Sequence, residues 1–271
     1  MKFSALVLLF AAAAMVAPLS AAPKTSAGAA AAAGSDIADD PAAAPKSGVR
    51  FVICSPDGAK LPPVLYYKSG KTTYKSVSIG SRTPTPRIRP EAGVVNFYAE
   101  DPTPALAAAT AATGAEKKEV KMPEPVLSVD VPGSGKQLGI LVPSKSGKTQ
   151  SFIVKESAFP KGGMHIINFS SFPLKMTTAT KPDFSDKKES IVGVFHSDKG
   201  ISDENTWTFK GDSGQSISFM LAYKTKDAKD FKNFKASKFI VSDQQSQINI
   251  VVKDPARDTL KLLSIQMTED K

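Results

Sequence analysis

Apolar and polar residues alternate along short segments of this chain, most clearly in its C-terminal part. Within residues 215–224 every second side chain is apolar, namely Ile217, Phe219, Leu221 and Tyr223. The pattern recurs at 127–131 and 248–252, and no segment shows a long apolar stripe of helical period. Because successive side chains of a strand point to opposite faces, this alternation predicts sheets with one buried and one wet face.

Such segments repeat from Gly48 onward, separated by turns rich in Gly, Pro, Ser and Lys. Residues 64–67 and 74–79 predict the two arms of a hairpin around 69–71. The proline-rich segment 82–90 predicts a sheet edge or an extended crossing, because proline cannot donate to a strand ladder. About a dozen short strands at this spacing predict an all-β fold, a mainly antiparallel β-sandwich.

The first residues predict a signal peptide, residues 1–21. Lys2 supplies a positive charge, residues 5–17 form an apolar run, and Leu19-Ser20-Ala21 offers a small residue for cleavage. A membrane span needs about 20 apolar residues. We therefore expect cleavage and no transmembrane span in the mature chain.

Composition divides the remainder into four parts. Residues 22–47 are rich in Ala and Pro and predict a flexible linker. Residues 48–100 predict an N-terminal β unit, 101–125 a linker or short helix, and 126–271 a C-terminal β-sandwich unit. The pattern leaves open whether the two β units are one domain or two.

Charge and cysteine content indicate the environment. The only cysteine, Cys54, can form no internal disulfide and does not lie where a lipoprotein would be cleaved. These features predict a bacterial protein of the periplasm, the outer-membrane surface or the extracellular space. The net charge of +9 favours anionic partners such as acidic glycans. The alternative is that this charge serves only to keep the protein soluble. No compact run of basic residues marks a nucleic-acid site.

One motif resembles a catalytic loop. Residues Gly211-Asp212-Ser213-Gly214 resemble the nucleophile loop of chymotrypsin-like proteases, which needs a histidine base. His196 lies only 17 residues upstream, and the other histidine is His165. We favour a hairpin turn between residues 206–209 and the strand from 215. A secreted serine hydrolase using Ser213 stays an alternative.

Other motifs predict no cofactor, no metal and no nucleotide. The two Gly-Lys-Thr sequences, at 70–72 and 147–149, lack the upstream glycine of a phosphate-binding loop. Two distant histidines and one cysteine give no zinc spacing. The acidic residues at 183–204 match no calcium loop. His165 shares a strand face with Ile167 and Phe169, which predicts a packed core histidine. We therefore expect a protein that is not an enzyme.

Aromatic residues give the candidate binding sites. Tyr66, Tyr67 and Tyr74 share one predicted hairpin with Lys68, Lys71 and Lys75, and Trp207 lies near the acidic loop. Aromatic side chains beside basic ones suit protein or sugar contact. We favour the interpretation that half of each alternating set belongs to the core, because apolar strand residues usually face inward.

Two stretches of the sequence resemble a family of exported β proteins from Verrucomicrobia. The residues concerned are Leu61-Pro62-Pro63 with Tyr66, Gly70 and Tyr74, then Phe159-Pro160-Lys161-Gly162-Gly163 with Asn168-Phe169-Ser170 and Pro173-Leu174. The resemblance implies an immunoglobulin-like fold and association with a type IV pilus-like system, and it carries no catalytic residues. From it we expect an accessory protein of a pilus-like or secretion assembly. A carbohydrate or anionic-glycan binding module is the alternative.

Overall fold

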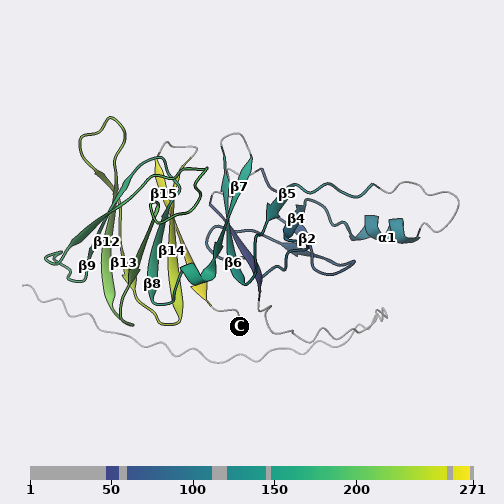
Figure 1. The fold of residues 1–271 in the computed structure, drawn as a ribbon, viewed down its shortest axis with the longest axis horizontal. Helices are drawn as coiled ribbons and strands as arrows, with labels where there is room; N and C mark the ends of the chain where they lie inside the picture. Colours follow the sequence, from purple (N-terminus) through teal and green to yellow (C-terminus); the bar gives the residue numbers. More distant parts are fainter. Residues whose placement is uncertain (1–46, 55–59, 112–120, 145–147, 255–258, 269–271) are drawn as a thin grey trace, which may run out of the picture. The chain divides into compact units, whose positions relative to one another are not determined.

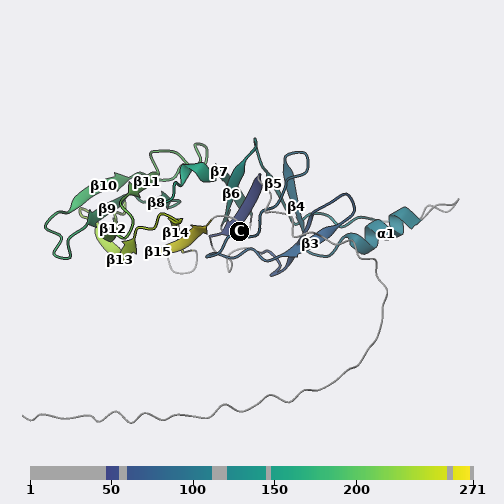
Figure 2. The ribbon, with the colours of Figure 1, turned by 90° about the horizontal axis from the view of Figure 1, so that it is seen from below.

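Strands dominate the described part of the chain and form four sheets there (Figures 1 and 2). The structure is a computed structural model that describes residues 47–54, 60–111, 121–144, 148–254 and 259–268. These residues all belong to one compact unit, 41–271. The predicted signal peptide and residues 22–46 of the predicted linker lie outside the described part.

The first sheet is antiparallel throughout and has the order β3-β2-β4-β5. Its strands are β2 (Leu65–Lys68), β3 (Tyr74–Val77), β4 (Val94–Tyr98) and β5 (Leu127–Asp130). The pairing of β2 with β3 confirms the predicted hairpin. β4 and β5 pair with each other, although the 101–125 segment separates them in sequence.

The second sheet has the order β1-β6-β7, with β1 parallel to β6. Its strands are β1 (Gly48–Ile53), β6 (Lys136–Pro143) and β7 (Thr149–Lys155). The proline-rich segment follows the other edge of β1, where the Thr85 amide donates to the Phe51 carbonyl at 3.0 Å and Val49 bridges to Ile88. This arrangement confirms the predicted extended crossing.

The third sheet has the order β11-β8-β14-β15, with β8 parallel to β14. Its strands are β8 (Gly163–Asn168), β11 (Thr206–Lys210), β14 (Gln245–Lys253) and β15 (Leu260–Thr268). The fourth sheet, β10-β9-β12-β13, is antiparallel throughout. Its strands are β9 (Leu174–Ala179), β10 (Lys188–Val192), β12 (Ser216–Tyr223) and β13 (Lys232–Ile240). The all-β, mainly antiparallel prediction is confirmed.

Helical structure is confined to short segments of the described chain. Helix α1 spans Thr103–Ala111, inside the predicted 101–125 linker or short helix, and the 3₁₀ turn η2 spans Glu156–Ala158. Residues 112–120 of that linker lie outside the described part. Over the described ranges, no helix has the length and apolar character needed to cross a bilayer.

Three apolar layers hold the four sheets together. One contains Phe51 and Phe97 and joins the first and second sheets. Another contains Ile140 and Ile250 and joins the second and third, and the last joins the third and fourth. Strands β1 and β8 are therefore buried at every residue. The expectation of one wet face per sheet is wrong for the second and third sheets, because each is covered by another sheet on both sides.

The connection between β11 and β12 also differs from the prediction. β11 pairs with β8 in the third sheet, whereas β12 pairs with β9 and β13 in the fourth. Residues 211–214 therefore form a turn that passes between sheets, not a hairpin turn. The turn itself was predicted, and Gly214 adopts the φ of +83° that favours glycine.

Candidate functional site

The outer face of the first sheet gathers three tyrosines on three adjacent strands. Tyr66 of β2 lies opposite Tyr98 of β4, and Tyr74 of β3 lies opposite Lys68 of β2. All three rings are half-buried. Their strand neighbours on the other face, such as Phe97, enter the core between the first and second sheets. We call Tyr66, Tyr74 and Tyr98 the tyrosine face.

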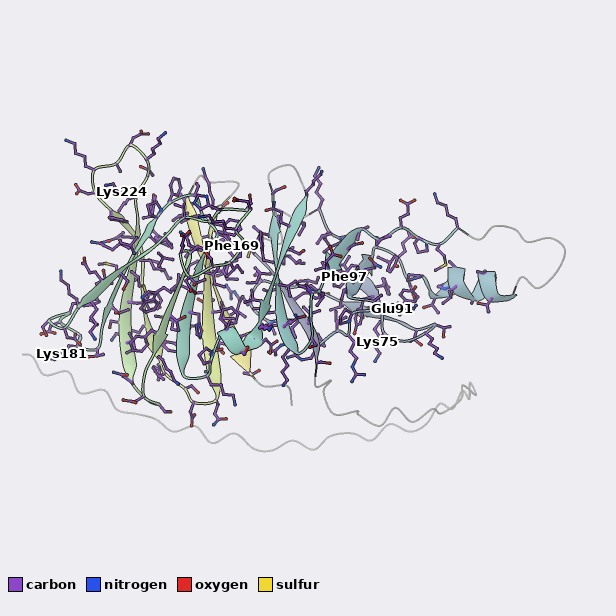
Figure 3. All side chains as sticks on the ribbon, viewed as in Figure 1. Lys75, Glu91, Phe97, Phe169, Lys181 and Lys224 are labelled. Atoms are coloured by element: carbon purple, nitrogen blue, oxygen red, sulfur yellow. The ribbon has the colours of Figure 1, made fainter. Side chains whose placement is uncertain are left out.

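The tyrosine face contains one aromatic contact and has one ion pair beside it. The Tyr74 and Tyr98 rings meet edge to face, with centroids 5.6 Å apart and planes at 85°. Lys68 Nζ forms an ion pair of 2.8 Å with Glu91 Oε1, and Figure 3 labels Glu91 at this sheet. The tyrosine face thus combines flat aromatic surface with hydrogen-bonding groups at its margin, a mixture that suits contact with another molecule.

Electrostatic contacts couple these side chains. Burial raises the pKa of Tyr98 above its usual value, and the neighbouring Tyr74 adds to the shift. The hydrogen bond to Glu91 raises the pKa of Lys68. At neutral pH Tyr98 is therefore a neutral donor and acceptor, and Lys68 is protonated beside Glu91.

Beyond the ends of β4 and β5 lies an open hollow of about 620 Å³. Glu100 and Asp101 line it from the β4 side, Pro104 and Ala105 from α1, and residues 121–124 from the approach to β5. Glu100 is two residues from Tyr98, so the hollow begins where β4 of the tyrosine face ends.

The structure brings together only two of the four predicted binding residues. Tyr66 and Tyr74 share the tyrosine face. Tyr67 points the other way and packs against the core between the first and second sheets, where burial raises its pKa. Trp207 lies on β11 of the third sheet, where its ring stacks on Phe209 with centroids 6.2 Å apart.

Sequence reasoning missed Tyr98 and Glu91 as members of this surface. The available signal was alternation within 94–98, which places Tyr98 and Asn96 opposite the apolar Val95 and Phe97. Nothing in the local pattern shows that β4 pairs with β2 and so places Tyr98 beside Tyr66.

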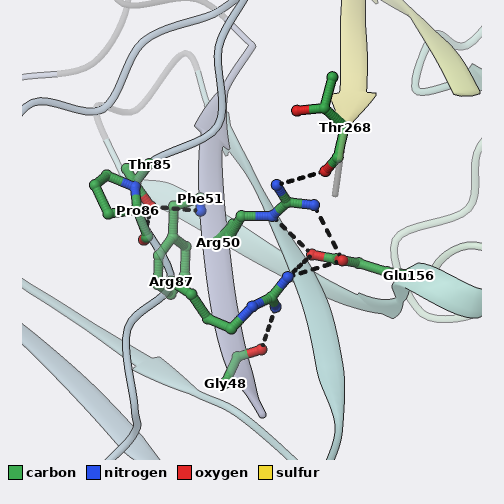
Figure 4. Close-up of polar contacts among 8 residues, drawn as sticks. All are labelled: Gly48, Arg50, Phe51, Thr85, Pro86, Arg87, Glu156 and Thr268. Carbon is green, nitrogen blue, oxygen red and sulfur yellow. Dashed lines mark hydrogen bonds and ion pairs between the residues drawn. The ribbon is translucent and has the colours of Figure 1, made fainter. Parts of the chain in front are cut away.

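A second polar cluster lies between the second and third sheets (Figure 4). The Glu156 carboxylate accepts hydrogen bonds from both guanidinium groups, from Arg50 Nε at 2.9 Å and from Arg87 Nη2 at 2.9 Å. Arg50 also donates to the Thr268 carbonyl, and Arg87 to the Gly48 carbonyl. Only 1% of the Arg87 side chain and 13% of the Glu156 side chain is exposed. Because these charged groups bind one another and the backbone, we infer that the cluster stabilises the folded protein.

His165 is a buried core residue, as predicted. It is 2% exposed, its Nδ1 lies 3.0 Å from Thr208 Oγ1, and its Nε2 lies 3.4 Å from the Pro160 carbonyl oxygen. Burial lowers the pKa of His165, and the contact with Pro160 opposes the shift only in part. The imidazole is therefore neutral in the folded protein at neutral pH.

Folding stability should fall as the pH drops below about 6.5, the usual pKa of histidine in an unfolded chain. Below that pH the unfolded chain gains a proton at His165 that the folded protein does not yet bind. The free energy of unfolding should fall by at most about 1.4 kcal/mol per pH unit from this group. Urea unfolding of His165→Gln between pH 7 and 5 should show a flatter profile than wild type. The exposed His196→Gln control should keep the wild-type slope, and an unchanged slope in His165→Gln would exclude His165 as the cause.

The other candidate motifs are engaged in turns. Asp186 accepts hydrogen bonds from Thr180 and from the Lys181 amide, which lowers its pKa to about 2 and closes the β9–β10 turn.

In the part of the chain described, no group of three His, Cys, Asp or Glu residues is placed to hold a metal ion. Burial raises the pKa of Cys54 to about 12, so its thiol is protonated. Across the described ranges no hydrogen bond joins Ser213 to a histidine.

No protein-family model matches this sequence, and a search of curated proteins finds no match.

Proposed function

We propose that this chain is an exported protein of the cell envelope that works by binding, with the tyrosine face as its contact surface. The observation that carries the proposal is the gathering of the half-buried Tyr66, Tyr74 and Tyr98 on the outer face of the first sheet. Tyrosine supplies a large, rigid contact area and loses little conformational entropy on binding, and it is enriched among residues that dominate binding energy.

The partner we propose is a protein of a pilus-like or secretion assembly. The tyrosine face lies on an antiparallel sheet and has the Lys68–Glu91 ion pair at its margin. It therefore resembles a protein contact surface more than an enclosed ligand pocket. The predicted signal peptide supports a location in the periplasm, at the outer-membrane surface or outside the cell. The resemblance to exported β proteins supplies the link to a pilus-like system.

A pull-down from envelope extract tests this proposal. The baits are the mature chain and the variant Tyr66→Ser/Tyr74→Ser/Tyr98→Ser. A matched control, Ile191→Ser/Ile240→Ser, removes two apolar side chains that are 60% and 66% exposed on the fourth sheet. Urea unfolding confirms that each bait is folded.

Wild type and the control should recover the same envelope proteins. The tyrosine variant should recover at least about tenfold less, because loss of one such anchor commonly costs 2 kcal/mol or more. Equal recovery by the tyrosine variant and wild type would refute the tyrosine face. Labelling of wild type at Ser213 by a serine-reactive phosphonate would instead support the hydrolase.

A further inference from the structure

Another open hollow, of about 430 Å³, lies between the segment that follows β3 and the strands β14 and β15. All of its lining side chains are polar. They are Arg82, Thr83, Gln247, Ser264, Gln266 and Thr268. None of these six is acidic or aromatic, unlike the lining of the hollow beside α1, where Glu100, Asp101 and Glu124 contribute carboxylates. We call this space the polar hollow.

Strand register explains why polar side chains gather here. β14 and β15 are antiparallel, with Gln247 opposite Gln266 and Asn249 opposite Ser264. Residues that lie opposite each other in two paired strands present their side chains to the same face, so these four form one polar face. The alternate residues, such as Ile248, enter the apolar layer between the second and third sheets. The core on the other face therefore fixes the direction in which the polar side chains point.

Asn249 is fully buried next to this hollow and has one polar atom without a partner. Its Oδ1 accepts hydrogen bonds from Gln247 Nε2 at 3.0 Å and from Ser264 Oγ at 2.6 Å, and both donors belong to lining residues. In the part of the chain that the structure describes, no acceptor binds Asn249 Nδ2. A buried donor without an acceptor lowers folding stability. The hydrogen-bond network beside the polar hollow therefore has more donors than acceptors.

Arg82 adds a positive charge to this excess of donors. Its side chain is exposed, and over the described ranges no ion pair or hydrogen bond joins its guanidinium to another residue. Arg87 of the same segment, in contrast, is buried and binds Glu156. A guanidinium has five N–H donors and no acceptor, in a plane that matches a carboxylate. The polar hollow therefore offers one positive charge that no lining carboxylate balances.

We propose that the polar hollow binds a small carboxylate that also carries several hydroxyl groups, which is the chemistry of a sugar acid. The carboxylate pairs with the Arg82 guanidinium. The ligand hydroxyls bond to the amide and hydroxyl side chains of β14 and β15, which both donate and accept as they do. One guanidinium balances the single charge of a carboxylate, whereas a phosphate monoester carries a charge near −2. A nucleotide base has no aromatic side chain to stack on among the lining residues.

The test measures binding of the mature chain to glucuronate by isothermal titration calorimetry. Glucose lacks the carboxylate, hexanoate lacks the hydroxyls, and glucose 6-phosphate carries a phosphate instead. N-acetylglycylglycine carries a carboxylate with amides in place of hydroxyls, as the end of a peptide does. The variants are Arg82→Gln and Gln266→Ala, both at exposed positions, so each should fold as wild type does. The matched control, Arg89→Gln, removes the same charge from another exposed position of the same segment.

Wild type and Arg89→Gln should bind glucuronate with the same Kd, and each of the four comparison ligands more weakly. Arg82→Gln should raise the Kd for glucuronate about tenfold, because a hydrogen bond between charged groups contributes about that factor in affinity. This variant should no longer distinguish glucuronate from glucose. Gln266→Ala should raise the Kd for both sugars about threefold, through the loss of a neutral hydrogen bond.

Two kinds of result would contradict the proposal. No binding of glucuronate to wild type, or an equal Kd in wild type and Arg82→Gln, would overturn the assignment of the polar hollow as the site. Glucose 6-phosphate, hexanoate or N-acetylglycylglycine binding as tightly as glucuronate would overturn the ligand class.

Discussion

Replacing Glu156 by Gln should lower the free energy of unfolding by about 3–5 kcal/mol, because it leaves buried charge without a counter-charge. Glu156 is the carboxylate that both Arg50 and Arg87 bind, and 9% and 1% of their side chains are exposed. Glutamine keeps the size of the side chain but directs an N–H₂ group at one guanidinium. Urea unfolding at pH 7 measures the difference.

Glu204→Gln is the matched control for this prediction. Its carboxylate pairs with Lys199 at 3.4 Å, but 67% of the Glu204 side chain is exposed. Exposed pairs contribute at most about 1 kcal/mol, so this variant should remain close to wild type. If both substitutions lowered the free energy of unfolding equally, burial would not explain how much the Glu156 carboxylate contributes to stability.

The second large effect is expected at Phe51, which is fully buried between the first and second sheets. Its ring meets that of Phe97 edge to face with centroids 5.2 Å apart. Phe51→Ala should lower the free energy of unfolding by about 3–5 kcal/mol, through lost burial and the cavity left behind. The variant should also have a lower urea midpoint with an unchanged m-value.

Gly139 of β6 provides an internal check, because the Phe51 ring occupies the space where a side chain would be. A Cβ at Gly139 would lie 2.5 Å from Phe51 Cδ1 and 3.2 Å from Ile153 Cδ1. Gly139→Ala alone should therefore destabilise the protein by about 1–3 kcal/mol through overpacking. In the Phe51→Ala background the same substitution should cost much less. Additive effects would contradict the contact between this ring and Gly139.

Local pattern predicted the strands but not their partners. β12 was found from its period-two alternation, which is fixed by strand geometry within a few residues. β11 and β12 belong to two different sheets because β11 pairs with β8 and β12 pairs with β9. The local sequence pattern does not predict these pairings. Alternation in β14 predicted one wet face, yet Asn249 and Val251 are fully buried. Whether a second sheet covers the outer face of a strand depends on residues far away in the sequence, so local alternation does not reveal it.

The candidate site shows the same division. The β2–β3 hairpin could be predicted because a short turn joins its strands, so Tyr66 and Tyr74 were identified together. Tyr98 was missed because β4 reaches β2 only after the long proline-rich segment. The Arg50–Glu156 pair joins residues 106 positions apart. A single charged residue inside the apolar run of β1 signals a buried partner, but the sequence does not identify that partner.

Site-specific photo-cross-linking in the cell of origin tests whether the chain binds its partner through the tyrosine face. The photoreactive p-benzoylphenylalanine replaces Tyr66 in one strain and Ile191, an exposed residue of the fourth sheet, in another. We expect a discrete adduct with an envelope protein from position 66 and none from position 191. Positions 74 and 98 are tested in the same way. An adduct from position 191, together with no adduct from positions 66, 74 and 98, would contradict binding through the tyrosine face.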